Sequence, residues 1–152
     1  MSPRFMPFKT APELIEALTK VEKVLNTGGL EPSLGELVKL RASQINGCAY
    51  CIYMHVSDAR ARGETEMRLF MLDAWRESSL YTDRERAALA WTESLTRVAK
   101  TGAPDEDYAL VKDQFNEGEL TYLTIAIGMI NLWNRLQVGA RATHPVHAAT
   151  AA

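Results

Sequence analysis

Apolar residues recur at helical spacing along nearly the whole chain, and no run shows the strict alternation of β-branched residues that is typical of strands. The pattern therefore predicts an all-α fold, a bundle of about seven helices. Breakers such as Gly28-Gly29 and Asn46-Gly47 separate the periodic segments. The expected helices run from just after Pro12 to Gly28, from about Pro32 to Asn46, from about Cys48 to Arg62, from Thr65 to Trp75, from Thr82 to about Val98, from Asp105 to Phe115 and from about Glu119 to Arg141.

No internal repeat, low-complexity linker or shift in composition divides the 152 residues. A chain of this length buries roughly two-thirds of its unfolded surface in one core. We therefore expect a single domain over residues 1–152, with a frayed tail from about residue 144.

Charge and terminal sequence exclude several classes of function. The 17 Lys and Arg residues are mixed with 19 Asp and Glu residues, and no basic block is present, so we expect neither nucleic acid nor an anionic membrane as a partner. The N-terminal sequence MSPRFMPFKT lacks the apolar run of a secretory signal, and no stretch approaches the roughly 18 apolar residues of a membrane span. These observations predict a cytoplasmic protein.

The last long helix is apolar on two faces, which in a small protein indicates that both are covered. We expect one face to be buried against another subunit; a central position in a monomer is the alternative. Asn131 and Asn134 share the first face, where burial would require hydrogen-bond partners, so they either fix packing or hold a ligand. The first face carries Leu120, Leu123, Ile127 and Val138, and the second carries Tyr122, Ile125, Met129, Leu132 and Trp133.

Cys48, Cys51 and His55 lie within about 60° of one another on one helical face. Without a secretory context, a cysteine pair at this spacing indicates redox or metal chemistry. The first turn of a helix lowers the pKa of a thiol at Cys48, and His55, one turn after Cys51, can take or return a proton. Two small buried thiols and a core histidine are the alternative interpretation.

Glu36 precedes Cys48 by twelve positions, which would separate the two by about 18 Å in one straight helix. The break at Asn46-Gly47 permits the helices to fold back, so that this carboxylate approaches His55 as the end of a proton relay. Ser33 and Glu36 also have the spacing of a capping box, and the residues alone leave both roles open.

Two other uses of the cysteines are less consistent with the sequence. Zinc would require His144 and His147 as further ligands, and these are closer in sequence than the histidines of structural zinc sites. A disulfide exchanger of the thioredoxin type would place its cysteines after a strand, which a helical sequence does not supply.

The chemistry-bearing residues fall in one segment, ELVKLRASQINGCAYCIYMH, in which eleven residues separate Glu36 from a Cys-x-x-Cys-x-x-x-His motif. This segment, with TDRERAALAWTESLT and ELTYLTIAIGMINLWNRL downstream, resembles the alkylhydroperoxidase D-like (AhpD-like) branch of the carboxymuconolactone decarboxylase (CMD) family. The resemblance covers most of residues 30–140.

The resemblance implies an all-helical homo-oligomer, a trimer or hexamer, that reduces hydroperoxides with a dithiol such as a dihydrolipoyl protein as reductant. It places Glu36, Cys48, Cys51 and His55 at the relay and redox positions of the family. Tyr50 stands where well-studied peroxidase members have a second histidine, and a phenol with a pKa near 10 is a poor proton shuttle at neutral pH. The decarboxylase branch lacks the cysteine pair, so we do not expect lactone decarboxylation.

The leading hypothesis is a thiol peroxidase that needs no metal or bound organic cofactor. Helix position favours a thiolate at Cys48, whereas the nearer His55 and the resemblance favour Cys51, and we assign the attack on the peroxide to Cys51. Cys48 then forms the disulfide, His55 and Glu36 relay protons, and an external dithiol restores the thiols. The alternatives are a non-catalytic redox-sensing or assembly protein and a protein thiol-disulfide oxidoreductase.

Overall fold

The computed structural model describes residues 2–145, which contain nine α-helices, one short 3-10 helix and no strand. The prediction of an all-α fold is therefore confirmed. Most of the tail expected from about residue 144, including His147, lies outside the described residues. The α-helices are α1 (Pro7–Thr10), α2 (Pro12–Thr27), α3 (Pro32–Asn46), α4 (Ala49–Ala61), α5 (Glu66–Met71), α6 (Asp83–Thr96), α7 (Val98–Thr101), α8 (Asp105–Gln114) and α9 (Glu117–Ala140), and the 3-10 helix spans Leu72–Ala74.

The predicted bounds differ from the structure at two kinds of position. Two four-residue helices, α1 and α7, were not expected, because a single turn is too short to show hydrophobic periodicity. The last helix begins two residues before the expected Glu119, because Asn116 caps it in a capping box with Glu119. The capping box expected at Thr82 and Glu85 is present at the start of α6.

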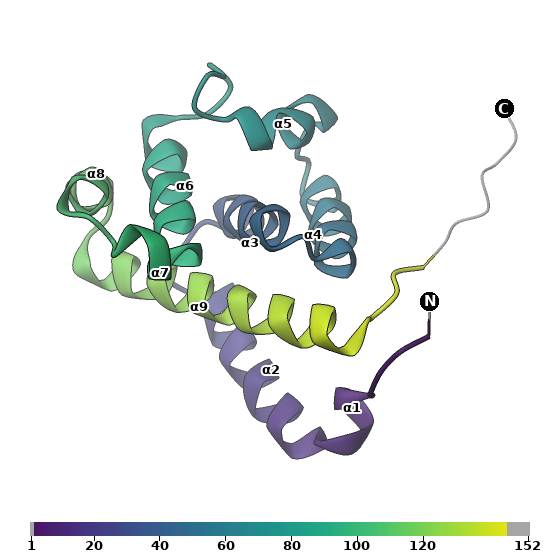
Figure 1. The fold of residues 1–152 in the computed structure, drawn as a ribbon. Coiled ribbons are helices and arrows are strands. Elements are labelled where there is room, and N and C mark those ends of the chain that lie inside the picture. The colour runs from purple at the N-terminus through teal and green to yellow at the C-terminus, as the bar shows by residue number, and fades with distance from the viewer. Residues whose placement is uncertain (1, 146–152) are drawn as a thin grey trace, which may run out of the picture.

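Helix α3 is the central element of the bundle, with α4, α6 and α9 packed around it (Figure 1). Its buried residues include Leu37, Val38 and Leu40, which are fully inaccessible to solvent. Two cations on the same helix are also buried and are paired: Arg41 Nε donates to Glu93 at 2.8 Å, and Lys39 Nζ donates to Glu22 at 3.1 Å. Burial of a charge is tolerated only with such partners.

The first two helices lie outside this core. Figure 1 shows α2 crossing α9 and extending beyond it, and no residue of α1 or α2 is buried. Helix α2 is nevertheless fixed at its inner end, where Glu22 accepts hydrogen bonds from Lys39 of α3 and from Trp133 of α9. It therefore forms one wall over α3 and α9 without contributing to the core.

Helix α9 has one buried and one exposed apolar side. Leu123 and Ile127 are buried, whereas the large apolar side chains of Ile125 and Leu132 are exposed on the single chain. None of the helices in residues 2–145 combines the length and apolar character that a membrane crossing requires.

Gly29 fixes the approach of the α2–α3 loop to α9. Its φ is +82°, and a Cβ there would lie 2.2 Å from Cγ of Tyr122. Gly63 has a similar φ of +90° but open space around its Cα. We expect Gly29→Ala to lower the free energy of unfolding by about 3 kcal/mol, from left-handed backbone strain plus the clash, and Gly63→Ala by about 1 kcal/mol, from strain alone. Urea denaturation measures both, and equal losses would contradict the close approach.

Candidate active site

The turn between α3 and α4 brings the site together. Gly47 adopts the left-handed conformation, with φ 65° and ψ 31°, and its N–H donates to carbonyls of the last turn of α3. The Cys48 N–H then donates to the Ser43 carbonyl at 3.0 Å, which completes the helix end. The chain reverses here, so α4 returns beside α3 as the break at Asn46-Gly47 predicted.

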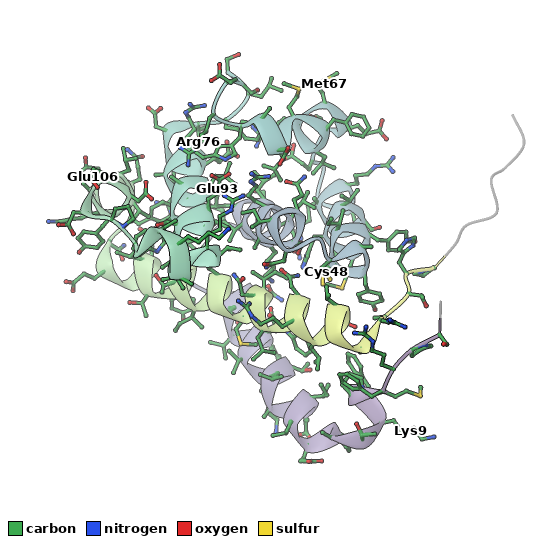
Figure 2. The ribbon with its side chains drawn as sticks, viewed as in Figure 1. Lys9, Cys48, Met67, Arg76, Glu93 and Glu106 are labelled. Carbon is green, nitrogen blue, oxygen red and sulfur yellow. The ribbon has the colours of Figure 1, made fainter. Side chains whose placement is uncertain are left out.

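Cys48 is the N-cap residue of α4, and its Sγ accepts a hydrogen bond from the Cys51 N–H at 3.4 Å. Both cysteines are free thiols with 1% of their surface exposed. Figure 2 places Cys48 where the start of α4 faces α9. The sulfurs therefore lie at the positive end of a helix and out of bulk water, where a thiolate is stabilised by the backbone N–H groups.

The structure brings Glu36 and His55 together across α3 and α4. Nδ1 of His55 lies 2.9 Å from Oε2 of Glu36, and both side chains are buried. The capping-box interpretation of Glu36 is wrong, because α3 begins at Pro32 without a side-chain cap and Ser33 lies inside its first turn. Burial raises the pKa of Glu36, but the hydrogen bond from His55 and the charges of His55, Lys39 and Arg62 outweigh it, so the pKa is lowered overall.

His55 has one ring nitrogen free. A carboxylate accepts hydrogen bonds, so the short contact with Glu36 assigns a proton to Nδ1, and in the neutral imidazole Nε2 is then the acceptor. Nε2 is buried and has no hydrogen-bond partner among residues 2–145. A buried polar atom without a partner is rare and costly, and here it is a base oriented by a carboxylate.

Cys51 and His55 line the same pocket, of about 420 Å³, whereas Cys48 is not among its lining residues. Apolar side chains of Met54, Ile130 and Trp133 form part of its wall. Helices α1 to α4 and α9 contribute to it; the remaining lining residues are Phe8, Thr19, Glu22, Asn26, Glu36, Lys39, Tyr50, Asp58, Arg62 and Gln137. Of the two cysteines, Cys51 therefore lies in the wall of this pocket and Cys48 does not.

The two thiols differ in acidity. The pKa of Cys48 is lowered to about 7, first by the hydrogen bond from the Cys51 thiol and also by the Cys51 N–H and the Asn134 amide, against the opposing effect of burial. The pKa of Cys51 is raised, because it donates that hydrogen bond and because it is buried. Loss of one of the two thiol protons therefore leaves the other shared between the two sulfurs. The negative charge of this pair is favoured on Cys48.

Asn134 is a site residue that the sequence analysis did not assign to the cysteines. It is 1% exposed, its Nδ2 donates to Ser43 Oγ at 3.0 Å, and its Oδ1 accepts from Asn46 at 2.8 Å. The same amide also lowers the pKa of both cysteines. The one sequence feature that could have indicated this role is the position of an asparagine on the apolar face of the last helix.

One group in residues 2–145 has the donor types for a cation: single atoms of Glu36, His55 and Asp58 lie within 4.8 Å of one another. The carboxylate of Glu36 is already engaged by His55, and Arg62 Nε lies 3.8 Å from its other oxygen, which opposes a further positive charge. His144, considered above as a zinc ligand, stacks on Tyr53.

We expect the cysteine pair to ionise near pH 7, because Cys48 has a lowered pKa and thiolate increases as the pH rises through it. Replacing Asn134 with Leu removes the amide that lowers the pKa of both cysteines and should move the pKa of the pair toward the ~8.5 of a free thiol. The ultraviolet absorbance of the thiolate, followed during a pH titration, measures this change.

Asn131→Leu is the matched control, because Asn131 is a buried amide on the same helix whose partners include Thr96 and Asn46. It should leave the thiol titration close to that of the wild type. An unchanged titration in Asn134→Leu, with the helical circular dichroism retained, would show that the amide does not stabilise the thiolate.

Comparison with known proteins shows the family to which this chain belongs. The model of the carboxymuconolactone decarboxylase family matches residues 12–94. The uncharacterized protein YdfG of Bacillus subtilis (strain 168) is 40% identical over 138 residues, covering 91% of this chain and 94% of its own.

Solved structures with a similar fold include the following two. The Agrobacterium tumefaciens protein ATU0492, of unknown function and named as a candidate AhpD antioxidant defence protein, is 42% identical with a TM-score of 0.93, covering 96% of this chain and all of its own. The debrominase Bmp8 is 18% identical with a TM-score of 0.76, covering 89% of this chain and 73% of its own, and shares the fold alone. The chain therefore belongs to the carboxymuconolactone decarboxylase family and is one of its AhpD-like members.

Proposed function

We propose that the protein is a thiol peroxidase that reduces organic hydroperoxides through Cys51 and Cys48. The observation that carries this proposal is the free Nε2 of His55, a buried base that lines one pocket with Cys51 and is oriented by Glu36. A nucleophile, a base and a residue that orients the base form the arrangement that nucleophilic catalysis requires.

Access and acidity assign different roles to the two sulfurs. The charge of the ionised pair is favoured on Cys48, but transfer of the shared proton across the hydrogen bond places the thiolate on Cys51, which faces the pocket. The Cys51 sulfur attacks the terminal oxygen of the hydroperoxide; an S–O bond forms, the O–O bond breaks, and the sulfur is oxidised to sulfenic acid. The first proton lost by the cysteine pair is taken by His55 Nε2 and passes to the leaving alkoxide, which departs as the alcohol, while Cys48 keeps the second proton for the water that leaves in the next step.

The second step forms the disulfide. The Cys48 sulfur attacks the Cys51 sulfenic acid, the S–S bond forms, and the hydroxide that leaves takes a proton and departs as water. The hydrogen bond from the Cys51 N–H to Cys48 Sγ keeps the two residues close enough for this step. An external dithiol, such as a dihydrolipoyl protein, then supplies two electrons and two protons by thiol-disulfide exchange. This cycle needs no metal or organic cofactor.

The proposal includes self-association as a trimer or hexamer in the cytoplasm. The exposed apolar side chains of Ile125 and Leu132 on α9, and of Val21 and Val24 on the unburied α2, support a second copy as the partner that covers them. A reducing compartment suits a cysteine pair that a dithiol must return to thiols.

Turnover of cumene hydroperoxide with a small dithiol tests the proposal. Wild type should oxidise the dithiol catalytically, and Cys51→Ser should lose at least about 100-fold in rate because the pocket-facing nucleophile is gone. Cys48→Ser should form a sulfenic acid at Cys51 that a dimedone reagent traps. Undiminished turnover in both variants would exclude the mechanism, and reduction of a protein disulfide without any response to peroxide would favour a thiol-disulfide oxidoreductase.

Glu36→Gln tests the relay separately from the sulfurs. It removes the charge that holds His55 in the tautomer with a free Nε2, and it should lower the rate about 100-fold, within the usual range for general acid–base catalysis. Asp58→Asn is the matched control, because Asp58 is an exposed carboxylate lining the same pocket. Equal rates for Glu36→Gln and Asp58→Asn would contradict a relay through Glu36.

A further inference from the structure

A second hollow, of about 460 Å³, adjoins the pocket of Cys51. The two share Phe8, Tyr50 and Gln137 in their linings. We call this second hollow the N-terminal groove; its other lining residues are Pro3, Phe5, Met6, Pro7, Lys9, Ala140 and Ala142. A molecule longer than the first pocket can therefore extend past Tyr50 into the groove.

The groove is apolar, and about half of the surface of its largest apolar side chains is exposed. Phe5, Met6 and Phe8 are exposed by 46%, 57% and 57% of their surface, and α1 has no buried residue. The segment is nevertheless fixed to α9, because the Arg4 N–H donates to the Ala140 carbonyl at 2.9 Å and Phe8 stacks on Trp133. A contiguous apolar surface held in place in this way is typical of a binding site.

The groove has a single charged lining residue, Lys9, which makes no ion pair with any residue of the described part of the chain. The N-terminal groove, apolar with one positive charge at Lys9, complements a ligand that has a hydrocarbon chain and one anionic end. The first pocket adds the reactive sulfur of Cys51 at the other end of the same path.

We propose that the preferred substrate is a long-chain acyl hydroperoxide that occupies both hollows. Its O–O bond lies against Cys51, its hydrocarbon chain passes Phe8 and Tyr50 into the N-terminal groove, and its carboxylate pairs with Lys9. This inference rests on the peroxidase function proposed above and names the substrate class for that site.

The hydrocarbon chain and the carboxylate of the substrate contribute unequally to its binding. Each methylene removed from water strengthens binding by about fourfold, so several methylenes in the groove outweigh any other contact. A solvent-exposed ion pair at Lys9 contributes only about a few-fold, so its main effect is to orient the chain.

The test compares three peroxides: a long-chain unsaturated fatty-acid hydroperoxide, its methyl ester and tert-butyl hydroperoxide. For the wild type, kcat/KM for the fatty-acid hydroperoxide should exceed that for tert-butyl hydroperoxide at least about tenfold. Met6→Glu places a charge in the groove. It should remove most of the difference in kcat/KM between the two peroxides, while kcat/KM for tert-butyl hydroperoxide stays that of the wild type. Met67→Glu is the matched control, an exposed methionine on α5 at 61%, and should change neither rate.

Lys9→Glu should lower kcat/KM for the free acid a few-fold and leave the methyl ester unchanged, because only the acid carries the anionic end. Lys20→Glu, on exposed α2, is its control. Equal effects on acid and ester would contradict the placement of the carboxylate at Lys9.

Two further measurements separate this inference from the proposed function. If no peroxide is turned over by the wild type, the peroxidase function fails, and calorimetric binding of an unreactive long-chain hydroxy acid to wild type and Met6→Glu still tests the groove. If tert-butyl hydroperoxide is turned over but Met6→Glu has no effect on the long chain, the groove is not the subsite. A change in sedimentation of Met6→Glu, without a change in long-chain turnover, would instead show that a second copy of the chain covers the groove.

Discussion

The hydrogen bond between His55 Nδ1 and Glu36 Oε2 is the interaction on which the rest of the site depends. It joins α3, the central helix, to α4, which carries the cysteines, and it compensates for the burial of a carboxylate. It exists because Gly47 turns the chain back in a left-handed conformation, and it determines which ring nitrogen of His55 is free to move a proton. One contact thus joins the two helices and orients the imidazole of His55.

The cysteine pair is controlled by a second group of contacts, from the helix start and from α9. The position of Cys48 at the N-cap, the Cys51 N–H and the buried amide of Asn134 all stabilise negative charge on sulfur. The two cysteines differ in their access to the pocket, because Cys51 is among its lining residues and Cys48 is not. The lowered pKa and the place in the pocket wall therefore fall on different cysteines, Cys48 and Cys51 respectively.

The sequence predicted best what lies on one helix. The spacing of Cys48, Cys51 and His55 sets their common face, so their grouping followed from helical geometry alone. Glu36 was ambiguous, because the same spacing suits a cap, and only the start of α3 at Pro32 decides the matter. Asn134 lies 91 residues from its partner Ser43, and Phe8 reaches the pocket on a helix without buried residues, so neither placement has a local sequence signal. Such contacts depend on how distant helices pack.

The proposed peroxidase function requires Cys48 and Cys51 to act as one redox unit on peroxide. Mass spectrometry of the reduced protein after a stoichiometric pulse of organic hydroperoxide tests this most directly. We expect a loss of two hydrogens and a peptide in which Cys48 is crosslinked to Cys51, with Cys48→Ser retaining one added oxygen at Cys51 instead. An unchanged mass for the wild type, or oxidation confined to methionine, would contradict the central claim.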